Sequence, residues 1–395
     1  MNTVADYDFT GKRALIRVDF NVPLNDALEV TDNTRIMAAL PTINHILESG
    51  GSVVLMSHLG RPKSGPSKEF SLANLVDPLS NLLGRNVQFS RDCIGTEAFE
   101  KSAALKAGDV LMLENLRFYK DETNGDIGFA QQLAKHGDVY VNDAFGTAHR
   151  AHASTAIIAE CFEDRLCGYL LEAEVTNAQK VLDSSKPPFT AIIGGAKVSS
   201  KIEVITNLLD RLDHLIIGGG MAYTFLKAQG GQVGSSLVED DFLETANSIL
   251  IEAKTKGVDV HLPVDSIVAT AFSNDADRRV CDSNKIEPNW MGLDIGPEAI
   301  KHYKGILSKS QTILWNGPAG VFEFDNFSEG TKALGFAIAE ATKNGAYSLV
   351  GGGDSVAAAK QFGVADSVSY ISTGGGALLE FLEGKTLPGV AALMD

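Results

Sequence analysis

The sequence predicts an α/β protein made of two doubly wound domains, each with a parallel sheet that is covered by helices on both faces. Short apolar runs recur along both halves of the 395-residue chain, as expected for strands that are buried on both faces. Segments with the apolar spacing of amphipathic helices lie between most of these runs. Alternation of the two is typical of parallel sheets with helical crossovers. A chain of this length is expected to form two or three domains.

Five candidate strands lie in the first half of the chain. They are RALIRV (13–18), SVVLMS (52–57), NVQF (86–89), VLMLE (110–114) and DVYV (138–141). Between the first two, residues 34–50 place Ile36, Leu40, Ile43 and Leu47 on one face of a helix. This half therefore has the strand-helix alternation of a Rossmann-like domain.

The second half repeats the scheme with six candidate strands. They are FTAII (189–193), HLIIG (214–218), DVHLPV (259–264), TILWN (312–316), YSLVG (347–351) and VSYIS (368–372). After the first of them, a helix is expected in which Val198, Ile202, Ile205, Leu209 and Leu212 share one face. We therefore expect two Rossmann-like domains that face each other across a cleft.

The join between the halves is expected between Gly168 and Pro188. Residues 170–182 have the pattern of one helix, and the KPP sequence at 186–188 ends it, because proline disfavours helix at the preceding residue. The helix either bridges the two domains or is an ordinary surface helix. We expect domains over 1–168 and 188–376, joined by 169–187.

The composition excludes several classes of protein. A net charge of −16 without a basic run disfavours nucleic-acid binding. The N-terminus lacks a signal-peptide pattern, and no long apolar run predicts a membrane span. Four cysteines without C-x-x-C spacing indicate reduced thiols, as in the cytoplasm, and HRAH (149–152) lacks a further ligand for a metal. We expect a soluble, cytoplasmic monomer.

Arginine is concentrated where the predicted strands of the first half end. Nine of the twelve arginines lie within the first 165 residues. Ligands of open α/β sheets bind at the carboxyl ends of strands, and guanidinium groups bind carboxylate and phosphate oxygens with paired hydrogen bonds. Each arginine alone is explained by an ion pair with a surface acid. We expect one shared anion site from the set at strand ends and helix starts: Arg17, Arg35, Arg61, Arg117 and Arg150.

Glycine takes the corresponding positions in the second half. The clusters are GGAK (194–197), GGGM (218–221), NGPAG (316–320), GGGDS (351–355) and STGGG (372–376). Glycine lets backbone amides approach a ligand closely, which suits phosphate at helix starts. No G-x-G-x-x-G occurs, and the single GK[ST], at 384–386, has Leu379 in place of the first glycine of a P-loop. A nucleotide site of another design is therefore expected.

Two lysines and one aspartate supply charge beside these glycines. Lys197 and Lys201 lie at a helix start, where a cation opposes the helix dipole unless an anion binds there. Two solvated lysines are the alternative. Asp354 either caps the following helix or holds Mg²⁺ against a polyphosphate. The residues together suggest phosphoryl transfer between a small phosphorylated acid and a Mg-nucleotide.

An ordered set of motifs resembles the phosphoglycerate kinase family. The motifs are RVDFNVP, SHLGRP, ENLRF, DAFGTAHRAH, GGAKVS, LIIGGGMAYTFL, WNGPAGVFE, GGGDS and STGGGA with LEFLEGKTLPGV. They extend from Arg17 to Val390 in the order of that family. Departures are small: Ser355 stands where many members have threonine, and Leu378 where many have serine.

The resemblance implies reversible phosphoryl transfer from 1,3-bisphosphoglycerate to ADP, giving 3-phosphoglycerate and ATP, with Mg²⁺, hinge closure and no covalent enzyme intermediate. It implies a phosphoglycerate site of Asp19, Phe20, Asn21, Arg35, His58, Leu59, Gly60, Arg61, Arg117 and Arg150. It implies nucleotide contacts at Lys197, Lys201, Gly292, Pro318, Glu323, Gly352, Gly353, Asp354 and Ser355, with the metal on Asp354. Arg35 and Lys197 would stabilise the transferred group together with amides at 374–376, among them those of Gly375 and Gly376. The tail, 377–395, would return to the first domain.

Three other functions are alternatives to this one. A non-catalytic sensor of the same ligands would tolerate loss of Arg35, Lys197 or Asp354, and all three are present. An NAD-dependent dehydrogenase is disfavoured because the dinucleotide fingerprint is missing. Another acyl-phosphate-forming kinase would differ among the arginines of the first half.

Overall fold

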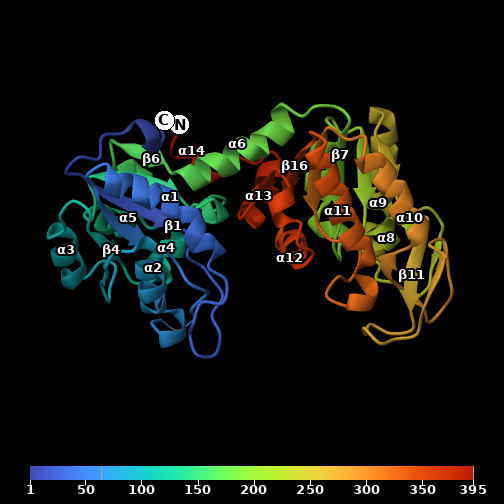
Figure 1. The fold of residues 1–395 in the computed structure, drawn as a ribbon, viewed down its shortest axis with the longest axis horizontal. Helices are drawn as coiled ribbons and strands as arrows, with labels where there is room; N and C mark the ends of the chain where they lie inside the picture. The colour runs from blue at the N-terminus through green and yellow to red at the C-terminus, as the bar shows by residue number, and fades with distance from the viewer. Residues whose placement is uncertain (64, 395) are drawn as a thin grey trace. The chain divides into compact units, whose positions relative to one another are not determined.

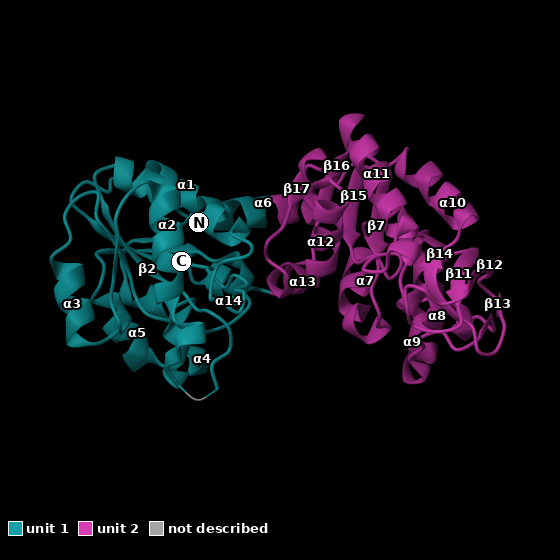
Figure 2. Cartoon of the chain, turned by 60° about the horizontal axis from the view of Figure 1, so that its bottom comes forward, with its two compact units in different colours: residues 1–176, 386–395 teal, residues 177–385 magenta. Residues whose placement is uncertain are grey.

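The computed structural model describes residues 1–63 and 65–394, which divide into two compact units (Figure 2). Unit 1 comprises Met1–Thr176 and Thr386–Asp395, and unit 2 comprises Asn177–Lys385. The chain passes from unit 1 into unit 2 within helix α6 (Tyr169–Asp183). The sequence had placed the joins at 168, 188 and 376. The binding roles assigned to the two domains stay predictions.

Unit 1 contains a six-stranded sheet in which every neighbouring pair is parallel. The strand order is β3-β4-β2-β1-β5-β6. The strands are β1 (Arg13–Val18), β2 (Ser52–Met56), β3 (Val87–Phe89), β4 (Val110–Met112), β5 (Val139–Asp143) and β6 (Arg165–Cys167). The five predicted strands are confirmed. The sequence missed β6, whose residues Arg-Leu-Cys do not form an apolar run.

The helices of unit 1 lie between these strands in the chain, apart from a last short helix in the C-terminal tail (Figure 1). They are α1 (Thr34–Glu48), α2 (Val76–Leu83), α3 (Thr96–Ala103), α4 (Lys120–Asn124), α5 (Ile127–Ala134) and α14 (Pro388–Ala391). Short 3₁₀ turns lie at Val4–Asp6, Lys68–Phe70, Leu72–Leu75, Leu116–Phe118, Phe145–Thr147 and Ile157–Cys161. The tail is tied to unit 1, since the amide of Gly389 donates to the carbonyl of Ala148 at 2.8 Å.

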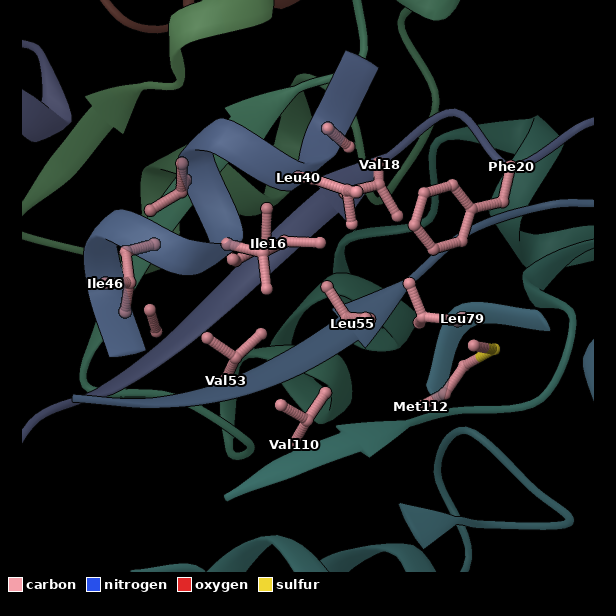
Figure 3. Packing of buried hydrophobic residues seen from close by; sticks show 14 of the residues in the cluster. Ile16, Val18, Phe20, Leu40, Ile46, Val53, Leu55, Leu79, Val110 and Met112 are labelled. Carbon is pink, nitrogen blue, oxygen red and sulfur yellow. The ribbon is translucent and has the colours of Figure 1, made fainter. Parts of the chain in front are cut away.

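The core of unit 1 is formed where α1 and α2 pack on the sheet. Leu40 and Ile46 of α1 lie over Ile16 of β1, while Leu55 of β2 and Leu79 of α2 extend the same cluster (Figure 3). The four residues predicted to face the sheet from this helix are all buried. Buried apolar area of this kind is the main favourable contribution to folding.

Replacing Leu55 with alanine is expected to lower the free energy of unfolding by about 2–5 kcal/mol, because the fully buried side chain leaves a cavity in a packed core. Met37→Ala is the control, since Met37 lies on α1 with 47% of its surface exposed. Urea unfolding of the two variants measures the difference. Equal losses would show that the buried core position on β2 contributes no more to stability than an exposed position on α1.

Unit 2 contains a second sheet of six parallel strands, in the order β10-β8-β7-β15-β16-β17. The strands are β7 (Phe189–Ile193), β8 (His214–Ile217), β10 (Asp259–His261), β15 (Thr312–Asn316), β16 (Tyr347–Val350) and β17 (Tyr370–Ile371). All six predicted strands are confirmed. The prediction of two parallel α/β sheets is therefore correct.

A smaller antiparallel sheet in unit 2 was not expected from the sequence. It consists of β12 (Arg278–Asp282), β11 (Asp265–Ala269) and β14 (Met291–Ile295). A two-stranded pair, β9 (Gln232–Val233) and β13 (Lys285–Ile286), lies beside it in the chain. Strand β12 is exposed along almost its whole length, so its residues carry no apolar alternation that a sequence pattern would reveal.

The helices of unit 2 lie between its strands in the chain, apart from the last of them, which follows β17 (Figure 1). They are α7 (Ile202–Leu208), α8 (Met221–Ala228), α9 (Leu243–Lys256), α10 (Pro297–Leu307), α11 (Glu329–Lys343), α12 (Gly353–Gln361) and α13 (Gly376–Leu382). Short 3₁₀ turns lie at Val198–Ser200, Asp240–Phe242, Asp325–Phe327 and Ala365–Ser367. Within residues 1–63 and 65–394, no helix has the length and apolar character needed to cross a membrane.

Candidate active site

The first group of predicted residues gathers at the carboxyl edge of the sheet of unit 1. Asp19 follows β1, His58 follows β2, and Arg117 lies in the 3₁₀ turn after β4. Since β1 and β2 are neighbours and β4 pairs with β2, the segments after these strands emerge side by side. This is the edge at which open α/β sheets bind ligands.

Arg35 is held at this edge through one of its nitrogens. Its Nη1 lies 3.2 Å from Oδ2 of Asp19 and donates to the carbonyl of Asn21 at 3.0 Å. The Asn21 side chain accepts from the amide of Gly60 at 2.8 Å, which joins the loops after β1 and β2. Nε and Nη2 of Arg35 make no hydrogen bond within the described residues, and 34% of the side chain is exposed. These nitrogens are therefore available to an anion.

Arg117 is a more deeply buried cation. Its Nη1 donates to the carbonyl of Gly60 at 2.8 Å, whereas its buried Nε has no hydrogen-bond partner in the described part of the chain. Burial, and next the charge of Arg17, lower the pKa of Arg117 to about 10, so it remains charged at neutral pH. A buried guanidinium with an unsatisfied nitrogen is costly without an anion, which indicates that a ligand completes the site.

His58 and Arg17 form a buried pair behind these groups. Nη2 of Arg17 lies 3.1 Å from Nδ1 of His58, while Nε of Arg17 donates to Oγ of Ser154 at 2.8 Å. Nη1 donates to the carbonyl of Val18. Arg17 was expected to bind the anion with the other arginines. That expectation is wrong, because Arg17 is fully buried and all three of its nitrogens are bonded to the protein.

Four other predicted residues take different positions. The side chains of Phe20 and Leu59 lie in the core of unit 1, so only their backbones are able to reach a ligand. Arg61 and Arg150 are exposed, and their side chains make no hydrogen bond or ion pair within the residues that the structure describes. The structure therefore brings together Asp19, Asn21, Arg35, His58, Gly60 and Arg117. Arg61 is close enough to Arg117 for its charge to lower the pKa of Arg117, but within the described residues no hydrogen bond or ion pair joins the side chain of Arg61 or Arg150 to this group.

The sequence missed a buried acid at this site. Glu122 of α4 is fully buried, and its carboxylate accepts two hydrogen bonds from Ser154. One comes from the Ser154 hydroxyl at 2.6 Å and the other from the Ser154 backbone amide at 2.9 Å. Nδ1 of His152 lies 3.9 Å from Oε1 of Glu122. Burial and the charges of Arg117, Arg17 and Arg150 lower the pKa of His152 to about 4, so it is neutral. No spacing in the sequence connects these residues.

The HRAH segment that contains His152 does not form a metal centre. Among residues 1–63 and 65–394, no cluster of His, Cys, Asp and Glu is arranged to hold a metal ion. His152 instead faces the carboxylate of Glu122 and the arginines of the site.

A second group of predicted residues gathers at the carboxyl edge of the sheet of unit 2. Nζ of Lys201 donates to Oδ1 of Asn316 at 2.5 Å, and Nδ2 of Asn316 donates to the carbonyl of Gly351 at 2.9 Å. These bonds join α7 to the ends of β15 and β16. Burial lowers the pKa of Lys201, and the nearby charges of Asp354 and Glu383 oppose that effect. Asn316 was not among the predicted site residues.

The loop before α12 is held by Ser355. Its Oγ accepts from the amide of Gly317 at 2.5 Å, which connects α12 to the end of β15. The helix begins at Gly353 after Gly352, so Asp354 lies within its first turn and Gly352 occupies the N-cap. Asp354 as a simple N-cap is therefore wrong. Its exposed carboxylate makes no hydrogen bond or ion pair with the described residues.

Some of the glycines are explained by packing of backbone on backbone. A Cβ on Gly317, whose φ is +111°, would lie 2.2 Å from the carbonyl oxygen of Gly194. By contrast, a Cβ on Gly353 would meet nothing within 4 Å. The glycine clusters thus serve both to pack the loops after β7 and β15 and to leave space where α12 begins.

The remaining predicted positions lie around this edge of unit 2. Lys197 is exposed and precedes the 3₁₀ turn Val198–Ser200, so the predicted helix begins as a 3₁₀ turn and α7 starts at Ile202. Pro318 is buried after β15, and Glu323 is exposed in the following turn. Gly292 lies in β14, where its amide donates to Oγ of Ser236 at 2.9 Å. Gly375 and Gly376 begin α13.

The chain is similar to known proteins over nearly its whole length. Residues 4–385 match the family model described as phosphoglycerate kinase. Phosphoglycerate kinase of Porphyromonas gingivalis is 55% identical over 416 residues, covering 99% of each chain. A cytosolic phosphoglycerate kinase of Triticum aestivum is 52% identical over 393 residues, covering 100% of this chain and 98% of that one. The solved phosphoglycerate kinase of Coxiella burnetii superposes with a TM-score of 0.91 at 43% identity, covering 99% of this chain and 98% of the other.

Proposed function

Because the chain belongs to the phosphoglycerate kinase family and is a glycolytic phosphotransferase with a carboxyl acceptor, we propose that unit 1 binds the phosphoglycerate and unit 2 binds ADP or ATP. The reaction is the reversible transfer of a phosphoryl group from 1,3-bisphosphoglycerate to ADP. The observation that carries the assignment of unit 1 is the buried Nε of Arg117, which lacks a partner within the described residues. A phosphate or carboxylate oxygen is the complement of such a group.

In unit 1, Arg35 and Arg117 would hold the anionic groups of the phosphoglycerate. Asp19 supports Arg35 at 3.2 Å, while its Oδ1 is buried without a hydrogen-bond partner among the described residues and would accept from a substrate hydroxyl. Asn21 positions the Gly60 loop. His58 would donate one hydrogen bond, and the exposed Arg61 and Arg150 would add charge on the solvent side.

In unit 2, Lys201 and the amides at the start of α12 would contact the nucleotide phosphates. Gly292, Pro318, Glu323, Gly352, Gly353 and Ser355 are proposed to line the nucleotide pocket, with Glu323 on the ribose. The ammonium of Lys197 makes no hydrogen bond or ion pair in the described part of the chain and would bind the transferred group, together with the amides of Gly375 and Gly376. These cations would neutralise charge that otherwise repels the attacking ADP.

Asp354 fits a magnesium ligand. Its carboxylate is exposed, unpaired within the described residues and close enough to Lys201 to affect its pKa, and Mg²⁺ usually takes one or two carboxylates together with phosphate oxygens. The bound ion would supply positive charge to the phosphates. Residues of the chain would orient the phosphates. Lys201, held by Asn316, would contact them, and Ser355 would fix the loop after β15.

No side chain is required as a nucleophile. An oxygen of the terminal phosphate of ADP would attack the phosphorus of the acyl phosphate, and the bond from phosphorus to the carboxyl oxygen would break to leave a carboxylate. The balance needs no proton from the enzyme. Catalysis would therefore depend on positioning and on charge stabilisation by groups such as Arg35 and Lys197.

The assay that tests this function is ADP release from MgATP as 3-phosphoglycerate is titrated in, with a coupling enzyme that removes the bisphosphoglycerate. Saturable, Mg²⁺-dependent release is expected. Binding of both ligands by calorimetry without turnover would instead indicate a sensor.

Asp354→Asn is expected to raise the Mg²⁺ concentration needed for half-maximal rate by about tenfold or more, because the neutral amide is a weaker ligand for a hard cation. Asp366→Asn is the control, since Asp366 is an exposed acid of the same unit and the change removes the same charge. Rates measured against free Mg²⁺ at saturating substrates give the comparison. If both variants keep the wild-type requirement, Asp354 does not bind the metal.

The remaining expectations concern the molecule in solution. We propose that the enzyme is a monomer, that it acts in the cytoplasm as the name of its cytosolic wheat relative suggests, and that transfer requires hinge closure. Small-angle scattering with and without both substrates measures the mass and any change in the radius of gyration. A dimer mass, or an unchanged radius with both substrates bound, would contradict the proposal.

A further inference from the structure

We propose that Arg17 is a positioning residue that selects the tautomer of His58, and that Ser154 and Glu122 hold Arg17 in place for this purpose. The inference deepens the proposed phosphoglycerate site and rests on it for its functional meaning. Its structural part concerns four buried residues of unit 1 and is testable in the protein without ligand.

The tautomer follows from the contact between the two side chains. Nη2 of Arg17 lies 3.1 Å from Nδ1 of His58, and both residues are buried. A guanidinium has only donors, so Nδ1 must accept this hydrogen bond. A neutral imidazole that accepts at Nδ1 carries its proton on Nε2. His58 is therefore left with Nε2–H as the one donor that it can offer to a phosphate or carboxylate oxygen.

A directed chain of hydrogen bonds keeps Arg17 in position. Nε of Arg17 donates a hydrogen bond to Oγ of Ser154 at 2.8 Å, and the Ser154 hydroxyl in turn donates a hydrogen bond to Oε1 of Glu122 at 2.6 Å. The amide of Ser154 donates to Oε2 of Glu122 at 2.9 Å, so both carboxylate oxygens are used. A third bond runs from Nη1 of Arg17 to the carbonyl of Val18. The guanidinium therefore has one orientation, in which Nη2 faces His58.

Asp19 is the competing partner for His58. Its Oδ1 lies 3.9 Å from Nδ1 of His58, which would be an ion pair if the imidazole were protonated. Arg17 already occupies Nδ1 at a shorter distance. Burial, followed by the charges of Arg17, Arg117, Arg35 and His152, holds the pKa of His58 well below its usual value. His58 is thus neutral, and Asp19 is left to Arg35 and the substrate.

This arrangement has a consequence for binding. The groups around His58 are Arg17, Arg117, Arg35 and His152, together with one acid, Asp19. While Arg17 is present, these surroundings keep His58 from titrating near neutral pH. Without Arg17, the proton of the neutral ring would be shared between Nδ1 and Nε2, and the ring would begin to titrate. Nε2–H would then be lost in part above the new pKa and regained below it, because an imidazolium donates from both nitrogens.

The test uses ¹⁵N chemical shifts of the imidazole nitrogens in the free full-length protein, with the His58 signals assigned by their loss in His58→Gln. We expect wild-type His58 to be protonated at Nε2 alone and not to titrate from about pH 8 to pH 5. Arg17→Met is expected to show mixed tautomers and a titration in that range. Arg13→Met is the control, because Arg13 lies on the same strand and pairs instead with Asp138 at 3.0 Å.

If Arg17→Met does not fold, Ser154→Ala removes only the hydroxyl between Arg17 and Glu122 and is expected to populate the second tautomer in part. A wild-type His58 protonated at Nδ1, or an unchanged tautomer in both variants, would overturn the inference. Calorimetry gives the pH dependence of the phosphoglycerate Kd, which a purely structural role of Arg17 would leave unchanged. The quantity to compare is the phosphoglycerate Kd of Arg17→Met divided by that of Arg13→Met. Ionisation of the ligand affects both values equally and cancels in this ratio. The ratio is expected to fall as the pH is lowered through the new pKa of His58.

A ratio that does not vary with pH would contradict the role of the tautomer in binding. The tautomer of His58 is measured independently of substrate binding, so a failure of the proposed function can be told apart from a failure of this inference. If the tautomer is as expected but 3-phosphoglycerate does not bind to the wild-type protein, the assignment of unit 1 fails while the positioning of His58 by Arg17 stands.

Discussion

Replacing Arg35 with alanine is expected to lower kcat by about 10³-fold or more, because an arginine that stabilises a transferred phosphoryl group acts mainly in the transition state. The phosphoglycerate Kd is expected to change much less. Arg117 and His58 would still hold the ground-state substrate, and Asp19 and Asn21 contact only Nη1 of Arg35. An interaction that strengthens as charge is redistributed lowers kcat and kcat/KM together when it is removed.

Steady-state rates in both directions, with phosphoglycerate affinity from calorimetry, separate the two effects. Arg91→Ala is the matched control, since the Arg91 side chain is 84% exposed in the same unit and, among the described residues, pairs only with Glu97. Equal fold losses in affinity and kcat for Arg35→Ala would mean that Arg35 binds the ground state and has no special role in transfer.

The sequence predicted the two main sheets because their strands are buried on both faces. An apolar run such as FTAII or TILWN is short, rich in β-branched or large side chains, and bounded by polar residues. The pattern disappears where a strand is brief or exposed. Strand β6 consists of Arg-Leu-Cys, which is no apolar run, and β12 is exposed along nearly its whole length, so neither has the pattern of a strand buried on both faces.

The structure gathers many of the residues predicted for the site of unit 1, but the sequence missed the buried residues that support them. Residues that follow strands are easily placed, because parallel strands bring their carboxyl ends to one edge. The burial of Arg17 could not be predicted, since nothing local distinguishes an arginine that faces a ligand from one that faces a buried serine. Glu122 and Ser154 lie 32 residues apart and meet Arg17 only through tertiary packing.

The glycines of unit 2 show the same limit. Their abundance at strand ends predicted a phosphate site, yet Gly317 is required where the loop after β15 packs on the carbonyl oxygen of Gly194. Asn316 was overlooked although it binds both Lys201 and Gly351. A side chain that organises neighbouring loops has no motif of its own, because its partners come from distant parts of the chain.

Lys197→Met is expected to lower kcat by about 10²–10³-fold, the effect typical of losing one preorganised group that stabilises transition-state charge. Nucleotide Kd is expected to change only a few-fold. Lys201, fixed by Asn316 at 2.5 Å, would still contact the phosphates. Lys197 is exposed and its ammonium makes no hydrogen bond or ion pair in the described part of the chain, so it is available to a ligand. Methionine keeps most of the side-chain length while removing the charge.

The control for Lys197 is Lys309→Met, because Lys309 is an exposed lysine of the same unit that precedes β15 and so lies toward the opposite edge of the sheet. Both changes alter net charge equally, which removes long-range electrostatics from the comparison. Single-turnover rates with bound ATP measure the chemical step directly. If Lys197→Met weakens nucleotide binding as much as it slows transfer, the lysine acts on the ground state. If it slows transfer alone, the cation before α7 acts on the phosphoryl group during transfer, as expected for an exposed ammonium that makes no hydrogen bond or ion pair within the described residues.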